Sequence, residues 1–412
     1  MAMTAKKPII LHIYPDFGQM GGIERYLLQT CAATDATQAW QTVVICNRGG
    51  TLHKQLAAQK TTVYGIKSFS CFKNANLRWL DAFSMIQILR LIRVIQPNLI
   101  HLHIGGLETA IYPAVLKRPT LLTLHGYGTL YSMAGVQNRL KRLIKHALRL
   151  GFNLAARQMH GITCVSQAEK SRLLAEGYLP QRPQAQVIPN GLNLEAWQAQ
   201  LDTQQKKTPS AEAPPYPGMH HYQPGEPIIV WLGRLDAVKQ PEHFIQIARQ
   251  LSQDFPKAWW VLAGDGDLFN AIASSVVLEP IPRLLCVGHQ PAASVLAHAT
   301  CLLHTPSAEG FGLSVLEAMA SGVPVISYAV GGVPELLAHF SECLSPPNDP
   351  LALAERLRRF MHLLQTNPDA KIRLSQALLT RANTNYSEAQ MMQTLLACYQ
   401  RLLYPQALTP PG

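Results

Sequence analysis

The chain has 412 residues, 48% hydrophobic and 15% charged, a length typical of two or three domains and a composition that excludes disordered, collagen-like and coiled-coil proteins. No apolar stretch reaches the about 18–20 residues of a membrane-spanning helix and no signal-peptide pattern opens the chain, so we expect a cytoplasmic protein. The net charge is +11, and residues 1–200 hold 22 basic and 8 acidic side chains. This part of the chain is therefore expected to bind an anionic partner; the alternative is that the basic side chains only increase solubility.

The first part of the chain alternates short apolar runs with helical patterns. A glycine-rich loop follows the first run, and helices are predicted from Ile23 and over 77–95. This alternation predicts a parallel sheet covered on both faces. The predicted strands are 9–14, 41–46, 98–103, 120–125 and 161–166.

Residues 198–226 are polar and proline-rich and show no periodicity, which predicts a linker or a surface insertion. The alternation then restarts, with strands predicted at 227–233, 258–264, 283–288, 301–305 and 323–327. The helices expected there span 240–253, 312–321, 350–364 and 387–403. We therefore predict an α/β protein with a first domain over 1–197 and a second over 227–386, and a final helix, 387–404, that packs back on the first. Ligands are expected in a cleft between the two sheets.

Residues 305–327, TPSAEGFGLSVLEAMASGVPVIS, hold the most informative motif. Gly310 and Gly312 precede a predicted helix, and a helix N-terminus without bulky side chains can bind phosphate. Glu309 lies in the loop. Glu317 lies in the helix, where it can accept hydrogen bonds from a diol or simply face solvent.

The stretch E-G-F-G-L-S-V-L-E, with its two glutamates, resembles the signature of the large retaining glycosyltransferase family, the glycosyl transferases of group 1. The resemblance implies the GT-B fold, in which two Rossmann-like domains face each other across a cleft. It covers most of the chain and is strongest over 228–335. It implies that Glu317 binds the ribose, Glu309 the sugar hydroxyls, and the N–H groups near Phe311, Gly312 and Leu313 the diphosphate.

The segment GRLDAVKQPE (233–242) resembles the family's G-R-x(4)-K-G, in which arginine and lysine bind the donor diphosphate. Arg234 and Lys239 match, and Gln240 replaces the usual glycine. Two fixed cations can stabilise a departing diphosphate without a metal, so the resemblance implies no metal and no cofactor.

Several glycines match the family's donor loops. Gly264, in G-D-G-D, resembles a turn beside the nucleotide, and Gly288 resembles the glycine near the base. Gly21 and Gly22 resemble a loop that brings backbone N–H groups to the donor, although such a pair also occurs in any tight turn. The D-x-D formed by Asp265 and Asp267 is interpreted as a coincidence, because that metal motif belongs to another fold.

His125 ends a predicted strand before a glycine and resembles the family's active-site histidine, near the transferred sugar. His101 and His103 also end a strand and are interpreted as structural. The eight cysteines contain no C-x-x-C pair and lie mostly in apolar runs, which indicates reduced core residues and no zinc site.

Residues 138–157 predict an amphipathic helix with a basic face. Its apolar stripe is formed by Leu140, Leu143, Ile144, Ala147 and Leu148. Its basic face is formed by Lys141, Arg142, Lys145, His146 and Arg149. Such a helix can lie on an anionic bilayer, as in family members with lipid acceptors, or pack its stripe on the sheet.

We therefore expect a retaining glycosyltransferase, a hexosyltransferase, that moves a sugar from a nucleoside-diphospho sugar to the hydroxyl of a glycan, lipid or small molecule. Its role would be polysaccharide or glycolipid synthesis, with a peripheral position on the cytoplasmic membrane face. The main alternative is an inactive scaffold or regulatory subunit that still binds a nucleotide sugar. An epimerase, a phosphorylase and a nucleic-acid binder fit less well, the last because no aromatic side chains interleave the basic ones.

Overall fold

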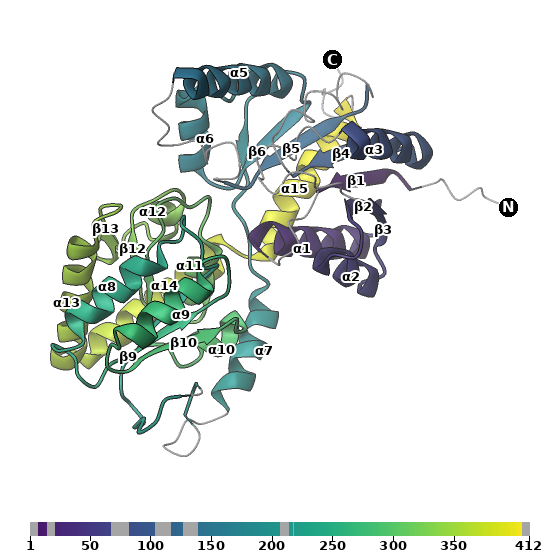
Figure 1. The fold of residues 1–412 in the computed structure, drawn as a ribbon. Helices are drawn as coiled ribbons and strands as arrows, with labels where there is room; N and C mark the ends of the chain where they lie inside the picture. Colours follow the sequence, from purple (N-terminus) through teal and green to yellow (C-terminus); the bar gives the residue numbers. More distant parts are fainter. Residues whose placement is uncertain are drawn as a thin grey trace. The chain divides into compact units, whose positions relative to one another are not determined.

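A computed structural model describes residues 7–14, 21–66, 82–103, 117–126, 139–206, 214–216 and 218–405 (Figure 1). The chain divides into two compact units. Unit 1 comprises residues 1–190 and 391–412, and unit 2 comprises residues 191–390. Each unit contains one sheet, and the described strands pair only in parallel. The protein therefore has the predicted α/β class, with two Rossmann-like domains.

The sheet of unit 1 has the order β3-β2-β1-β4-β5-β6-β7. Its strands are β1 (Ile9–Ile13), β2 (Gln41–Asn47), β3 (Thr62–Ile66), β4 (Leu99–Leu102), β5 (Thr120–Leu124), β6 (Gly161–Cys164) and β7 (Gln186–Val187). The helices are α1 (Gly22–Ala36), α2 (Thr51–Ala58), α3 (Ala82–Ile95), α5 (Arg139–Ala156), α6 (Gln167–Ala175) and α15 (Glu388–Leu403).

Alternate residues of β1 pack on opposite faces of this sheet. Leu11 and its neighbours two residues away join a core with α3, α5 and α6. Ile10 faces the other way and packs with Leu395 and Tyr399 of α15, the helix that returns from the far end of the chain (Figure 1). Both faces are therefore buried, and for this reason the strands read as nearly continuous apolar runs.

The sheet of unit 2 has the order β10-β9-β8-β11-β12-β13. Its strands are β8 (Ile228–Leu232), β9 (Trp259–Ala263), β10 (Leu284–Gly288), β11 (Cys301–His304), β12 (Val325–Tyr328) and β13 (Leu344–Ser345). The helices are α7 (Leu194–Gln205), α8 (Pro241–Leu251), α9 (Phe269–Leu278), α10 (Ala292–Leu296), α11 (Leu313–Ala320), α12 (Val333–Leu336), α13 (Pro350–Thr366) and α14 (Pro368–Asn385), with a short 3-10 turn, η2 (Ser341–Cys343). Trp231 and Trp260 lie in its main core with residues of α8 and α13.

The predicted linker is shorter than expected. Residues 198–205 continue α7 and do not form a linker, and 191–197 group with unit 2. Asn193 caps this helix by accepting the Ala196 N–H at 3.0 Å, and Trp197 and Leu201, four residues apart, bury one face of it. The polar side chains lie on the exposed face of this helix, and they are the reason why the sequence did not predict a helix here.

Candidate active site

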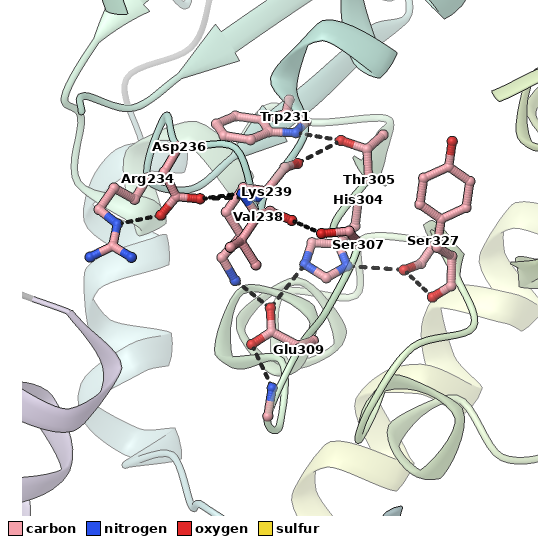
Figure 2. A network of polar contacts seen from close by, with 12 residues as sticks. Trp231, Arg234, Asp236, Val238, Lys239, His304, Thr305, Ser307, Glu309 and Ser327 are labelled. Carbon is pink, nitrogen blue, oxygen red and sulfur yellow. Dashed lines mark hydrogen bonds and ion pairs between the residues drawn. The ribbon is translucent and has the colours of Figure 1, made fainter. Parts of the chain in front are cut away.

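The loop after β8 is built around Asp236. One carboxylate oxygen, Oδ1, accepts the N–H groups of Val238 and Lys239 at 3.1 and 3.0 Å, and the other, Oδ2, lies 2.6 Å from Nε of Arg234 (Figure 2). The side chain of Arg234 is 61% exposed. The two matched cations of the motif therefore belong to one loop whose backbone is fixed by an acidic side chain between them.

Gln240 closes this loop in the left-handed region, with φ +46° and ψ +56°. This is the position where the motif usually carries glycine, so the substitution leaves the turn in place. Its side-chain oxygen is buried and has no hydrogen-bond partner among the described residues.

Gln240→Gly is expected to raise the free energy of unfolding by about 1 kcal/mol. Glycine removes the cost of holding a residue with a side chain in the left-handed region and the cost of burying an oxygen without a hydrogen-bond partner. Together these two free-energy costs exceed the cost of ordering glycine, which has more conformational entropy in the unfolded chain. Urea unfolding of the two proteins measures this difference. Gln240→Val should be destabilised, and a stable valine variant would contradict the backbone explanation.

Glu309 lies in the loop after β11 and contacts two basic side chains. Nζ of Lys239 bonds directly to its Oε2, and Nε2 of His304 lies 3.5 Å from the same oxygen (Figure 2). Burial alone would raise the pKa of Glu309, but the Lys239 ammonium and the neighbouring His304 imidazole hold that pKa far below its usual value. Glu309 is therefore a carboxylate at neutral pH.

The two loops are joined by hydrogen bonds at their base. Trp231 donates its Nε1–H to Thr305 Oγ1 at 2.9 Å, and Thr305 Oγ1 donates to the Gln240 carbonyl at 2.9 Å. The Ser307 N–H donates to the Val238 carbonyl at 2.8 Å. These bonds set the distance between the loop that carries Lys239 and the loop that carries Glu309.

A glycine pair that the sequence analysis did not single out allows another close approach. A Cβ at Gly331, where φ is +51°, would lie 1.5 Å from the carbonyl oxygen of Glu309. Any side chain there would displace the Glu309 loop, since atoms that are not bonded cannot come so close. The sequence signal was the dipeptide Gly331–Gly332, which begins three residues after the end of β12.

Helix α11 begins beside this carboxylate. Gly312 is its N-cap and Leu313 its first residue, and Phe311 is 5% exposed. The Gly310 N–H donates to Glu309 Oε1 at 3.2 Å. The first amides of a helix lack intrahelical partners, which makes this end suitable for an anion. Glu317 lies one turn further into α11 and is 4% exposed.

The remaining predicted glycines of unit 2 lie at adjacent strand ends. The Gly264 N–H donates to the Gly288 carbonyl at 2.8 Å, which joins the turns after β9 and β10. A Cβ at Gly264 would lie 1.9 Å from the Gly233 carbonyl oxygen, so only glycine fits there. Asp265 and Asp267 are exposed, and Asp265 Oδ1 accepts the Gly266 N–H at 2.7 Å.

The predicted residues of unit 1 form two groups. Gly21 caps α1 and Gly22 is its first residue. The Gly21 N–H donates to Glu24 at 2.9 Å, and Tyr14 donates its hydroxyl to the same carboxylate at 2.8 Å. The Gly21 amide is thus already hydrogen-bonded to a buried side chain.

His125 belongs to a cluster of histidines, which the sequence analysis treated as separate residues. Its Nε2 lies 3.1 Å from Nδ1 of His103, and Nε2 of His103 lies 2.9 Å from Nδ1 of His12. His101 lies beside them with its Nδ1 2.7 Å from the Tyr399 hydroxyl and its Nε2 2.6 Å from Thr123 Oγ1.

Burial keeps these imidazoles neutral. It lowers the pKa of His12 and of His125 to about 3, and it holds the pKa values of His101 and His103 well below the usual value.

Nitrogen atoms of His12, His101 and His103 come within 4.8 Å of one another, so these three are the described residues most suited to a metal. Their bonding does not fit one. Both nitrogens of His101 are paired with hydroxyl groups, and the 2.9 Å contact between His12 and His103 is a hydrogen bond. The cluster is therefore a hydrogen-bonded network.

Comparison with known proteins assigns the family. The model of "Glycosyl transferases group 1" matches residues 220–400, and that of "Glycosyltransferase Family 4" matches residues 20–196. The chain belongs to the group 1 glycosyltransferases. Together the two matches include every predicted site residue.

Relatives and solved structures agree with this assignment. The glycosyltransferase is 26% identical to the gpi3 subunit of phosphatidylinositol N-acetylglucosaminyltransferase from Schizosaccharomyces pombe, over 82% of this chain and 69% of that protein. It is 27% identical to the 2-deoxystreptamine N-acetyl-D-glucosaminyltransferase of Streptomyces fradiae, over 68% of this chain and 66% of that one. The Anabaena protein HepE, solved with UDP and glucose, matches with a TM-score of 0.73 at 18% identity, over 95% of this chain and 99% of HepE, which confirms the GT-B fold.

Proposed function

We propose that this glycosyltransferase transfers a hexose from a nucleoside-diphospho sugar to an acceptor hydroxyl with retention of configuration and without a metal. The observation that carries the proposal is the placement of Glu309. This residue lies on the loop that leads into α11, and it is an anion that forms an ion pair with Lys239. A carboxylate that can accept hydrogen bonds from sugar hydroxyls and amides that can bind phosphate thus lie on one short segment.

Each predicted residue then has a role. Arg234 and Lys239 would neutralise the diphosphate, helped by the N–H groups of Phe311, Gly312 and Leu313, while Glu317 would bind the ribose diol. Gly264 and Gly288 would leave room for the base. Two residues of unit 1 complete the proposal. The backbone N–H of Gly22 would bind the donor phosphate, and His125 would contact the transferred sugar.

The transfer breaks the bond between the anomeric carbon and the diphosphate oxygen and forms a bond from that carbon to the acceptor oxygen on the same face. The acceptor proton passes to the departing phosphate oxygen. The two cations lower the energy of this step, because negative charge develops on the diphosphate as the bond breaks.

Uridine is the proposed base and N-acetylglucosamine the first sugar to test. Two relatives are N-acetylglucosaminyltransferases by name, and the HepE structure holds UDP and glucose. A glycolipid or polysaccharide acceptor is proposed on the same ground.

Thermal unfolding with UDP, GDP, ADP, CDP and dTDP, each at about millimolar concentration, tests the donor site. We expect UDP to stabilise the protein most, by about 2.7 kcal/mol if it is present at 100 times its dissociation constant. Glu317→Ala should lose most of this shift because the ribose contact is gone. No shift with any nucleotide would favour an inactive scaffold, and a preference for another nucleotide would correct the base.

We further propose a peripheral position on an anionic, cytoplasmic membrane face. Among the described helices none is long and apolar enough to cross a bilayer. In α5, Phe152 packs in the core, whereas Leu150 and Leu154 are 55% and 56% exposed and Ala147 is exposed. The other predicted stripe residues, 140, 143, 144 and 148, lie outside the described side chains. An exposed apolar face on a helix whose sequence contains five lysine and arginine residues suits an anionic surface.

Leu150→Ser with Leu154→Ser is expected to reduce pelleting with phosphatidylglycerol vesicles at low salt by at least about tenfold. Burial of an exposed leucine in the bilayer contributes about 1.5–3 kcal/mol. The matched control is Leu363→Ser in α13, where the leucine is 43% exposed on unit 2. Equal pelleting of the α5 variant and the wild type would exclude α5 as the membrane contact.

A further inference from the structure

The three rings His12, His103 and His125 form a series with two hydrogen bonds. Each ring is neutral, so each has one N–H and one nitrogen with a free lone pair. Two adjoining nitrogens form a hydrogen bond only if one carries the proton and the other does not. The protons of all three rings must therefore point the same way along the series.

Only two arrangements meet this condition. In the first, His12 donates from Nδ1 to His103, and His103 donates from Nδ1 to His125, whose own proton is then on Nδ1. In the second, all donors are reversed, and His125 has a lone pair on Nδ1. The tautomer of His125 is thus decided by the other end of the series, at Nε2 of His12.

That end favours the first arrangement. Nε2 of His12 is buried and has no hydrogen-bond partner among the described residues. The first arrangement leaves a lone pair there, whereas the second leaves an N–H. Buried donors without a partner are rarer in proteins than buried acceptors without one, because the lost hydration of an N–H is poorly replaced.

The ring of His125 is also held in place. Tyr26 of α1 packs edge-on against it, with ring centroids 4.7 Å apart. The ring of His103 lies beside it, with the ring centroids 5.4 Å apart and an angle of 26° between the ring planes. Its open nitrogen, Nδ1, makes no hydrogen bond to a described residue, and the ring is half-buried.

We propose that His12 and His103 are positioning residues that keep His125 in the Nδ1–H tautomer, so that its open nitrogen donates a hydrogen bond and does not accept a proton. The role at the sugar rests on the proposed function, in which His125 contacts the transferred group. As a donor, His125 would bind a sugar hydroxyl oxygen or developing negative charge, and it would not act as the base.

The test is nitrogen NMR of protein labelled with ¹⁵N-histidine, at neutral pH and without substrate. The chain has 15 histidines, and loss of one signal set in His125→Gln assigns the ring. We expect a pyrrole-type signal for Nδ1 of His125 and a pyridine-type signal for Nε2. The opposite pattern would overturn the proposal. Because no substrate is used, this result does not depend on whether the chain transfers sugar.

Variants test whether the series sets the tautomer. His12→Leu removes the donor and should let His125 populate both tautomers, whereas His12→Asn keeps an N–H near the position of Nδ1 and should preserve the wild-type pattern. His101→Gln is the matched control, because His101 is equally buried but its nitrogens bond hydroxyl groups outside the series. An unchanged His125 tautomer in folded His12→Leu would overturn the positioning role, and the wild-type spectrum decides the proposal even if that variant does not fold.

Discussion

Lys239→Ala is expected to lower the turnover number by about three orders of magnitude. The removed ammonium is one of two fixed cations proposed to meet the developing charge of the diphosphate, and loss of one such group costs about 10²–10³ or more in other enzymes. The structure adds a second reason, since Lys239 also neutralises Glu309. Without it, the pKa of Glu309 rises and its fixed position is lost.

The same variant should lose about 2 kcal/mol of stability. Breaking a fully buried pair costs about 3–5 kcal/mol, and this pair is less buried, at 25% and 14% side-chain exposure. The matched control is Arg249→Ala, which breaks the exposed Arg249–Glu279 pair and should leave turnover unchanged. Steady-state kinetics with a radiolabelled donor measures the effect. If Lys239→Ala and Arg234→Ala both turn over at the wild-type rate, the diphosphate assignment is wrong.

The free energy of unfolding is expected to fall steeply as the pH drops below about 6.5. His12, His101 and His103 are buried and their pKa values in the folded state lie far below those of the unfolded chain. Between about pH 3 and 6.5 the unfolded state therefore binds more protons, and stability falls as the pH falls. Each site contributes at most about 1.4 kcal/mol per pH unit.

Two pH units of such loss from three sites amount to at most about 8 kcal/mol, comparable to the whole stability of a typical domain. Urea unfolding at a series of pH values measures the slope. His101→Gln should reduce this slope by the contribution of about one proton, at most about 1.4 kcal/mol per pH unit. Equal slopes in the wild type and His101→Gln would contradict neutral burial of this cluster.

The sequence predicted the fold where apolar runs are continuous. The strands begin and end within about two residues of the predicted limits, because β1, β5 and β9 are buried on both faces. Strand β3 was not predicted, since only Ile66 of its five residues is buried and Gly65 interrupts its short pattern. Strands β7 and β13 have two residues each, too few for any periodicity.

The sequence predicted which residues form the candidate site, but it did not predict which of them contact each other. Lys239 and Glu309 were assigned to different parts of the donor, although the structure joins them directly. Nothing in the spacing of residues 239 and 309 could show this, because it depends on β8 and β11 being neighbours in the sheet. The contact between His12 and His103 could not be predicted for the same reason, since these residues lie 91 positions apart and meet only through the pairing of β1 with β4.

The packing of α15 on unit 1 has a consequence for how the protein is made. The helix supplies Leu395 and Tyr399 to the core, but the ribosome synthesises it only after the 200 residues of unit 2. At about 5–20 residues per second that delay is roughly 10–40 s. Unit 2 can thus complete its core before unit 1, although it is synthesised later. During that interval the face of unit 1 that carries the histidines has no α15 to cover it, and a chaperone would have a defined apolar surface to protect there.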